Sequence, residues 1–372
     1  MILLGVGRPG WWTRGWCGTS VADVRCGHQS RSALMPGERS VPESARPAVV
    51  VGAGLYAGFV EPTYLCSGVT WHEAGPALSM HEVSALPGDS GEEDEGRHEL
   101  LLTPGTRLAF EITAEGKYCL GFHRVHGRDD RTWVRCADQA PSERGSQCGR
   151  CFAQDDLRFM HDIHRSGIAP AGLKRYLDQP HWLYVATFAD GSTKVGTASH
   201  LRKRARLVEQ GAVVAQYVAH ARDGRIVRIL EDEVTRTVGL PQAVRSATKA
   251  ASLCAPLPSV QLEHVNDGFA LAARGLLAGG MGIEGFVVVH EEFEPPSSWS
   301  AVLSRRGLQP YPSPLGQGRH GVTVREVLGP SALVSIDGSD LVFVADLAQL
   351  KGRRLRAGDF STPVPAVQEA LF

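Results

Sequence analysis

The chain has 372 residues, with 39 lysines and arginines against 40 aspartates and glutamates. This length suffices for two or three domains that each bury a core, and the balanced charge excludes a protein that is basic throughout while permitting local basic patches. No apolar run approaches the about 20 residues that span a bilayer, and the apolar start MILLGVG is too short for a signal peptide. We therefore expect a soluble cytoplasmic protein without a membrane partner. Its thiols should be reduced, so the eight cysteines indicate a metal site more than disulfides.

Residues 1–60 show neither helical nor strand periodicity, and we expect disorder there or an extension from a start codon assigned too early. Within them, Val49 to Gly58 resembles a glycine-rich dinucleotide fingerprint, which requires a strand, a tight turn and then a helix. Pro62 and the β-rich segment Thr63 to Cys66 arrive before a helix can form, and no βαβ unit follows. We therefore expect no nicotinamide cofactor.

Short strands are predicted from Tyr64 to Val83 and from Leu100 to Leu120, and the alternation from Arg107 to Thr113 is the clearest of them. The acidic, glycine-rich segment from Gly88 to Gly96 between them is typical of a solvated loop.

A cysteine cluster comes next, formed by Cys119, Cys136, Cys148 and Cys151. The last two form a C-x2-C knuckle, which places two thiolates about a tetrahedral Zn2+ at about 2.3 Å. The first two lack a knuckle of their own, so a degenerate site without metal is the alternative. Four nearby histidines are further candidate ligands: His123, His126, His161 and His164. For His161 and His164, a position on a helix surface or at an interface is the better interpretation.

The segment from His181 to Arg206 predicts a β-hairpin followed by a basic helix. Trp182 to Phe188 and Thr193 to Thr197 are strand-like, with turn residues between them. Ser199 is a candidate helix N-cap. On a helical period Arg204 falls within the apolar arc of Leu201, Ala205 and Val208, whereas Arg202, Lys203 and Arg206 point away from it. An arginine on the packing side of a helix requires a partner.

The following elements complete a ββαβα unit. Gly211 ends the basic helix, Ala212 to Ala219 is a third strand, and Ile226 to Val238 is a helix with a broad apolar stripe. On this helix Glu231 lies at the edge of the stripe and Glu233 lies within it.

The rest of the chain predicts further helices and then a small β domain. Helices are expected at 242–254 and 265–277, and a strand at 285–290. From Leu308 onward, β-rich runs separated by turn residues indicate a small barrel or open sheet. The expected fold class is α+β in four parts: an extension at 1–60, a β-rich cysteine segment at 61–165, an α/β core at 166–300 and a small β domain at 301–372.

The ββαβα unit resembles a GIY-YIG nuclease core. Trp182-Leu183-Tyr184 stands in place of Gly-Ile-Tyr, and Lys194-Val195-Gly196 in place of Tyr-Ile-Gly. Leu201 and Arg204 match the family's helix arginine motif, and Leu230-Glu231 matches its acidic helix. More closely, residues 100–360 resemble an uncharacterised family of bacterial proteins that join a cysteine knuckle, such a core with a Glu-Gln-Gly-Ala signature (Glu209 to Ala212 here) and a C-terminal β segment.

The resemblance implies a Mg2+-dependent nucleic-acid phosphodiesterase with catalytic residues Tyr184, Lys194, Arg204 and Glu231. Arg202, Lys203 and Arg206 would bind substrate phosphates, and Glu233 is the alternate Mg2+ ligand. Trp182 replaces the first glycine of the motif and Lys194 the second tyrosine. A tyrosine with an ordinary pKa of about 10 acts as a base only if cations lower that pKa. The alternative is a non-catalytic, zinc-containing nucleic-acid-binding protein on a degenerate nuclease scaffold.

Overall fold

The computed structural model describes residues 62–83, 96–280 and 282–363, which belong to the unit Phe59–Phe372. The expectations for residues 1–60, for the glycine-rich segment at 49–58 and for all but the last residue of the acidic loop at 88–96 lie outside the described residues. In the part of the chain that is described, no helix is both long and apolar enough to cross a membrane.

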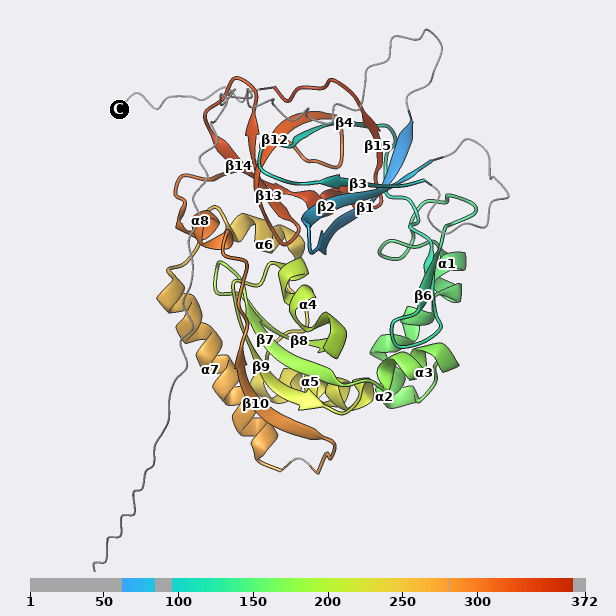
Figure 1. Ribbon diagram of the computed structural model, residues 1–372, viewed down its shortest axis with the longest axis vertical. Helices are drawn as coiled ribbons and strands as arrows, with labels where there is room; N and C mark the ends of the chain where they lie inside the picture. Colours follow the sequence, from blue (N-terminus) through green and yellow to red (C-terminus); the bar gives the residue numbers. More distant parts are fainter. Residues whose placement is uncertain (1–61, 84–95, 281, 364–372) are drawn as a thin grey trace, which may run out of the picture. The chain divides into compact units, whose positions relative to one another are not determined.

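The largest sheet combines strands from both ends of the described chain (Figure 1). Its nine strands have the order β11-β14-β13-β12-β4-β15-β1-β2-β3. Strand β4 lies between β12 and β15, so the segments 61–165 and 301–372 share one sheet and one core. The strands are β1 (Thr63–His72), β2 (Gly75–Glu82), β3 (Arg97–Leu101), β4 (Arg107–Ile112), β11 (Gln309–Pro310), β12 (Arg319–Leu328), β13 (Ser331–Ile336), β14 (Val342–Asp346) and β15 (Arg354–Ala357). A short 3-10 helix, η3 (Leu347–Leu350), precedes β15.

A four-stranded sheet of order β10-β9-β7-β8 contains the central elements in the predicted ββαβα order. The hairpin of β7 and β8 is in register from His181↔Ser199 to Thr187↔Thr193. The elements are β7 (His181–Thr187), β8 (Thr193–Ser199), the 3-10 turn η2 (His200–Arg202), α4 (Lys203–Gln210), β9 (Val214–Ala221), α5 (Gly224–Val238) and β10 (Phe286–Glu292).

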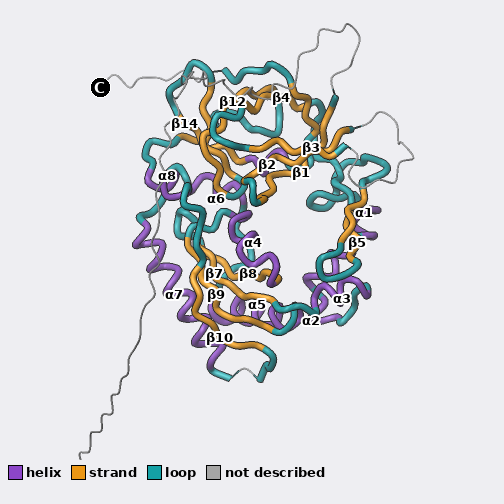
Figure 2. The backbone as a smooth tube through the Cα atoms, viewed as in Figure 1, coloured by secondary structure: helices purple, strands orange, loops and turns teal. Residues whose placement is uncertain are grey.

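Both faces of this sheet are covered, because side chains alternate between them along each strand. Leu183 and Val185 pack against α5 and α7 (Ser259–Ala278) on one face. Tyr184 and Ala186 point to the opposite face, where they pack with α4 and with side chains from α6 (Ser246–Ser252) and α8 (Trp299–Ser304). Figure 2 shows these helices around the sheet. The outer edge of β8 is closed in part by the Val195 N–H, which donates to the carbonyl of Pro241.

The register between β7 and β9 shifts between Leu183 and Tyr184. Asn266, from α7, donates to the carbonyl of Val185 at 3.2 Å and to the hydroxyl of Thr187 at 2.9 Å. Because unpaired buried carbonyls are costly, this buried amide stabilises the sheet next to the irregularity. The two residues held by Asn266, Val185 and Thr187, directly follow the shift and Tyr184 along β7.

A smaller segment joins the two sheets. It consists of the hairpin β5 (Phe122–Val125) and β6 (Arg131–Val134), followed by α1 (Gly149–Gln154), η1 (Asp156–His161), α2 (Ile163–Ser166) and α3 (Ala171–Leu177). A Cβ at Gly172 would lie 1.6 Å from the carbonyl oxygen of Val125, so α3 contacts β5 backbone to backbone. Buried Asp156 accepts the Val125 N–H at 2.9 Å. These contacts fix the hairpin against the short helices.

Candidate metal centre and adjoining basic cleft

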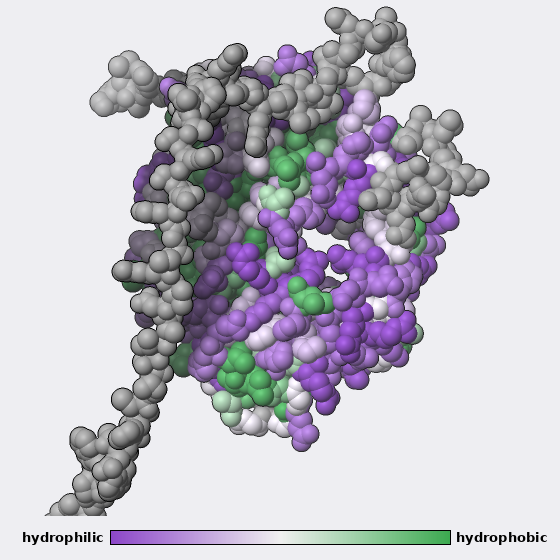
Figure 3. All heavy atoms as spheres, viewed as in Figure 1, coloured by the Kyte–Doolittle hydropathy of each residue, from purple (hydrophilic) through white to green (hydrophobic). Residues whose placement is uncertain are grey.

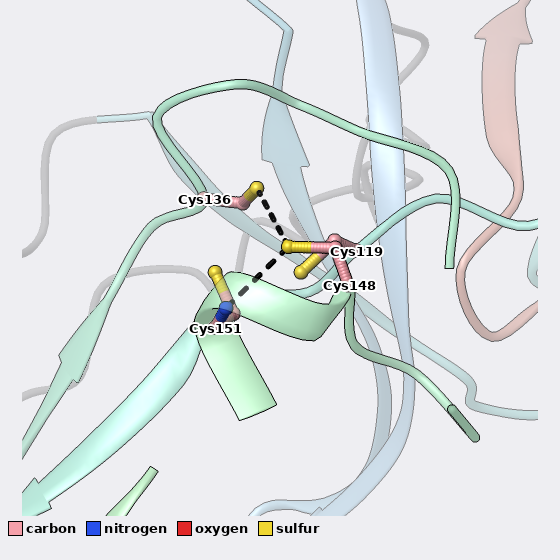
Figure 4. A group of neighbouring side chains, drawn as sticks. All are labelled: Cys119, Cys136, Cys148 and Cys151. Carbon is pink, nitrogen blue, oxygen red and sulfur yellow. Dashed lines mark hydrogen bonds between the residues drawn. The ribbon is translucent and has the colours of Figure 1, made fainter. Parts of the chain in front are cut away.

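The four cysteines singled out by the sequence lie together and are all buried. Their sulfur atoms are within 4.8 Å of one another, and the side chains point toward a common centre (Figure 4). The Sγ atoms of Cys136 and Cys148 are 4.0 Å apart. Thiolates at about 2.3 Å from a tetrahedral Zn2+ are about 3.8 Å from one another. The cluster can therefore hold a metal ion such as Zn2+ with small adjustments.

Backbone donors surround the sulfur atoms. Cys148 is the N-cap of α1 and accepts the Cys151 N–H, while Cys119 accepts the Gly121 N–H at 3.3 Å. Burial raises the pKa of Cys119 and Cys151; at Cys148 burial is outweighed by the Cys151 N–H and the neighbouring thiols, which lower its pKa. Among the described residues no other group of three or more cysteine, histidine or acidic side chains comes together in this way.

The histidines considered as alternative ligands lie elsewhere. His164 binds Asp232 of α5 through Nε2 at 2.9 Å, and Arg165 binds the same carboxylate. Gln242 donates to the other Asp232 oxygen at 2.9 Å. His164 is thus an interface residue that joins α2 to α5. His161 lies close enough to Arg228 and Glu231 for their charges to act on it, and burial lowers its pKa.

A second cluster is formed around Tyr184 at the β8 edge of the four-stranded sheet. The Tyr184 hydroxyl is fully buried and accepts a hydrogen bond from Nε2 of Gln210 at 2.7 Å. Burial raises the pKa of Tyr184, although the charge of Arg206 and the Gln210 amide act in the opposite direction. In the free protein, burial thus outweighs the nearby cations, and the pKa of Tyr184 lies above its ordinary value.

Two lysines with little or partial exposure contact this tyrosine or its partner Gln210. Nζ of Lys194 is 5.8 Å from the centroid of the Tyr184 ring and donates to the carbonyl of Gln242 at 2.9 Å. Burial lowers the pKa of Lys194 to about 8, with a further contribution from Arg206. Lys249 donates to the carbonyl of Gln210 at 3.1 Å, and burial together with Lys194 lowers its pKa to about 7.

Glu231 is the carboxylate that faces these cations. Its side chain is buried and accepts from Arg228 at 2.5 Å, and its charge opposes the lowering of the Lys194 pKa by burial. Glu233 lies nearer the surface and pairs with Arg236. The relative depths of Glu231 and Glu233 are thus the reverse of those expected from the apolar stripe. Neighbouring elements lie on this flank of α5: His161 of η1 is within reach of the charge of Glu231, and His164 of α2 binds Asp232.

The arginine of α4 that faces this cluster is Arg206, and not Arg204 as expected. Both arginines are exposed, but the charge of Arg206 acts on Tyr184 and Lys194, whereas that of Arg204 acts on Tyr217. Residues 200–202 form a 3-10 turn before α4 begins at Lys203. Because a 3-10 turn has fewer residues per turn than an α-helix, the helical phase predicted from Ser199 is displaced. Leu201 is consequently 62% exposed rather than packed.

The remaining predicted phosphate-binding residues are engaged by other groups. Arg202 pairs with Glu209 at 2.5 Å. Lys203 pairs with Glu291 and lies 3.5 Å from the centroid of the Trp182 ring. The structure therefore brings Tyr184, Lys194 and Glu231 together with Arg206, which the sequence analysis had assigned to phosphate binding. It also adds three residues that the sequence analysis did not assign to the site: Gln210, Arg228 and Lys249. The spacing of three residues on one helix predicts the ion pair of Arg228 and Glu231, whereas no sequence pattern predicts that Lys249 belongs to the site.

A cavity of about 320 Å3 adjoins this cluster. It lies between the β5–β6 hairpin, η1 and α3 on one side and β8, α4 and α5 on the other, and Arg206 and Arg228 belong to both the cluster and the cavity wall. Figure 3 shows a hollow near the centre of the viewed face, bordered mainly by hydrophilic residues. The charged lining residues are Arg128, Asp129, Asp130, Arg131, Arg202, Arg206 and Arg228.

The metal centre and the cavity are connected by the β5–β6 hairpin. Cys119 and Cys136 flank the two strands, and the tip from Gly127 to Arg131 lines the cavity. No curated protein and no solved structure matches the chain. The expected resemblance to a family without known function is confirmed for part of the chain: residues 105–251, which hold the four cysteines and the basic cluster, match the family described as "Protein of unknown function (DUF2797)".

Proposed function

We propose that the protein binds nucleic acid through its phosphate backbone, with the basic cluster and the adjoining cavity as the binding site. The observation that carries this proposal is a group of four cations whose charges act on one another, with Glu231 as the one carboxylate among the described residues that acts on Lys194: Lys194, Arg206, Arg228 and Lys249. Such an excess of positive charge is unfavourable in the free protein. It becomes favourable when an anion enters.

The state of the lysines supports an anionic ligand. Lys194 and Lys249 donate to backbone carbonyls, and neither forms an ion pair with a described residue. Burial therefore disfavours their charged forms. A phosphate group would supply the missing negative charge and several acceptor oxygens, and the guanidinium groups of Arg206 and Arg228 suit it geometrically.

The cavity provides access to this cluster. Arg206 and Arg228 line one wall, and Arg128 and Arg131 line the hairpin tip on the other side. Asp129 and Asp130 offset part of the charge of the tip. The net attraction for a phosphate therefore centres on Arg206, which forms no ion pair with any described residue.

The order of the elements supports a GIY-YIG-like scaffold. Strand β7 lies between β8 and β9, and α4 and α5 follow β8 and β9 along the chain, as the ββαβα resemblance requires. We further propose that the ion in the cysteine cluster is Zn2+, because four thiolates are typical ligands of structural zinc.

Mg2+-dependent phosphodiester cleavage is the second candidate function, favoured by the position of Glu231 beside Lys194 and Tyr184. Lys194 is the better base, because its pKa of about 8 is nearer neutrality than that of the buried Tyr184. A Mg2+ ion on Glu231 would have to share this carboxylate with Arg228, whose Nη1 lies 2.5 Å away. This competition makes binding the better supported of the two functions.

The test is binding of a fluorescent oligonucleotide, measured by anisotropy over a range of salt concentrations, with gel analysis in Mg2+ and in EDTA. Affinity that falls steeply with salt, without cleavage, supports phosphate-backbone binding. Cleavage that requires Mg2+ supports the second candidate. An absence of binding at low salt would contradict both.

A further inference from the structure

The cavity beside the basic cluster has two chemically different walls. Its cations come from the hairpin tip, η2, α4 and α5, whereas η1 and α3 contribute mainly apolar and aromatic side chains. We propose that the cavity accommodates one unpaired nucleotide, with its base against the apolar wall and its phosphate at Arg206 and Arg228. This inference rests on the proposed nucleic-acid binding and specifies which form of nucleic acid is bound.

The apolar wall can hold a base. Leu157 and Met160 of η1 and Tyr176 and Leu177 of α3 line the cavity, together with Val125 at the end of β5. Tyr176 is only partly buried and meets the ring of His181 edge-on, with centroids 6.0 Å apart and an interplanar angle of 82°. Stacking of a base on an aromatic ring of this kind contributes about 1–3 kcal/mol.

His181 adds a polar group to the cavity. Its side chain is 5% exposed, and Nδ1 lies 2.8 Å from the carbonyl of Gln179, so Nδ1 carries the proton and donates it. Burial lowers the pKa of His181, which keeps the ring neutral and leaves Nε2 as an acceptor. Nε2 has no hydrogen-bond partner among the described residues, and the ring lines the cavity. An exocyclic amine or ring N–H of a base is a matching donor.

A glycine keeps the space beside His181 open. A Cβ at Gly224, which also lines the cavity, would lie 3.2 Å from His181 Nε2 and 2.4 Å from Leu177 Cδ2. Any side chain at this position would therefore displace the histidine or the leucine. The combination of an apolar wall, an aromatic ring and a single buried acceptor is typical of a small-molecule site more than of a groove for a phosphate chain alone.

The size of the cavity selects against a duplex. A volume of about 320 Å3 is near the lower limit of ligand pockets, which are about 300–1,000 Å3. A base pair with both of its backbones requires a wider groove, whereas a single nucleotide can enter if it comes from a single strand, from a strand end or from an extruded position. The inference thus predicts a preference for unpaired nucleotides.

The experiment compares three labelled probes with the full-length protein: a single-stranded DNA oligomer, an abasic oligomer with the same number of phosphates, and a blunt duplex of the same sequence. We expect the single strand to bind about 5- to 150-fold more tightly than the abasic oligomer, as one stacked base implies. Equal affinity for the single strand and the abasic oligomer would overturn the base pocket but leave the proposed phosphate binding intact. Failure of all three probes to bind would contradict the proposed function itself.

Substitutions of residues that line the cavity test where the base binds. Tyr176→Leu removes an aromatic ring from the cavity wall, and Phe159→Leu is the matched control, because Phe159 lies on η1 but does not line the cavity. We expect Tyr176→Leu to reduce affinity for the single strand and to leave the abasic oligomer unaffected, while Phe159→Leu changes neither. Met160→Trp, which fills the cavity, should have the same selective effect. Equal losses for both probes in Tyr176→Leu and Met160→Trp would contradict the inference.

A competition experiment distinguishes binding of a free nucleotide from binding of a nucleotide within a strand. Displacement of the labelled strand by adenosine 5′-monophosphate but not by ribose 5-phosphate shows that a free nucleotide suffices and that the base is recognised. If neither displaces the strand while the single-strand preference persists, the nucleotide is taken from a strand. Displacement by ribose 5-phosphate and by the mononucleotide with equal potency would overturn the inference.

Discussion

The hydroxyl of Tyr184 occupies the space in which a side chain at position 196 would begin. Tyr184 and Gly196 are directly opposite each other on β7 and β8, and a Cβ at Gly196 would lie 2.5 Å from the tyrosine oxygen. The glycine in the Lys194-Val195-Gly196 motif is therefore required for the tyrosine to lie across the strand. If the tyrosine ring did not lie across Gly196, its hydroxyl would not reach Gln210.

We expect Gly196→Ala to lower the free energy of unfolding by about 1–3 kcal/mol, because an extra methyl group is forced into a packed site. The matched control is Gly268→Ala on α7, where nothing lies within 4 Å of the added Cβ. Alanine in a helix interior should stabilise by up to about 1 kcal/mol. Urea denaturation followed by circular dichroism measures both, and equal effects of the two substitutions would contradict the steric account.

The cysteine cluster should contain about one Zn2+ per chain, as expected for a four-thiolate site. Elemental analysis of the purified protein measures this content. The double substitution Cys148→Ser, Cys151→Ser should remove the metal and lower the unfolding temperature. Cys254→Ser is the control, because this cysteine lies outside the cluster. Full stability and an unchanged unfolding curve after metal removal would be incompatible with a structural ion.

Arg206→Ala should weaken oligonucleotide binding and reduce the slope of log affinity against log salt by about 0.9, the effect of losing one phosphate contact. Arg204→Ala removes the same charge from the same helix, but Arg204 faces away from the cluster. We expect it to leave the affinity nearly unchanged. Anisotropy titrations at several salt concentrations compare the two, and equal losses would show that the net charge of α4 matters more than its geometry.

Phosphate binding should depend on pH through the two lysines. Burial lowers the pKa of Lys194 to about 8 and of Lys249 to about 7, so both are charged below pH 7 and lose their protons as the pH rises. Affinity for an anion is then highest near pH 6 and falls toward pH 9. His161, which also faces Arg228 and Glu231, has a lowered pKa and contributes little above pH 7.

The same shifts predict the stability of the free protein. In the unfolded chain these lysines keep a proton up to about pH 10.4, so between pH 7 and that value the unfolded state binds more protons than the folded state. Stability should therefore rise with pH in this window. Lys249→Met should flatten the pH dependence of both binding and stability; a variant that retains the full dependence would exclude Lys249 as one of the groups responsible.

Glu231→Gln tests the second candidate function. Loss of a negative charge beside Lys194 and Arg206 should strengthen anion binding several-fold, while weakening of the bond to Arg228 should cost about 1–3 kcal/mol of stability. Any Mg2+-dependent cleavage should disappear. Glu233→Gln, whose partner Arg236 is exposed, should change binding and stability by less than about 0.5 kcal/mol. Cleavage that survives in Glu231→Gln would remove Glu231 as the metal ligand.

Local patterns were sufficient to predict the central elements and the position of the cysteine cluster. The C-x2-C knuckle of Cys148 and Cys151 and the apolar run of strand-forming residues in β7 are signals of a few residues, and both depend on interactions close in the sequence. The orientation of the arginines on α4 was not predictable in the same way. It depends on the 3-10 turn at 200–202, which has no distinct sequence signature.

Contacts between residues far apart in the chain were also not predicted from the sequence. Lys249 is brought to Gln210 by the packing of α6, and nothing in its surroundings marks it as part of the site. Glu231 is buried on a flank of α5 that the apolar stripe does not include, close to His161 of η1 and next to Asp232, which binds α2. Such contacts result from how elements pack, and periodicity within one element does not contain that information.

The position of β4 in the large sheet has a consequence for the synthesis of the chain. Glu111 on this strand pairs with Arg319 and Arg356, which follow it by 208 and 245 residues. A ribosome must therefore release almost the whole chain before both edges of β4 are paired, and until then these edges are available to other strands. Because distant pairings also slow folding, we expect a nascent chain that stops at residue 251, the end of the matched stretch, to aggregate or to require a chaperone rather than to fold as a domain.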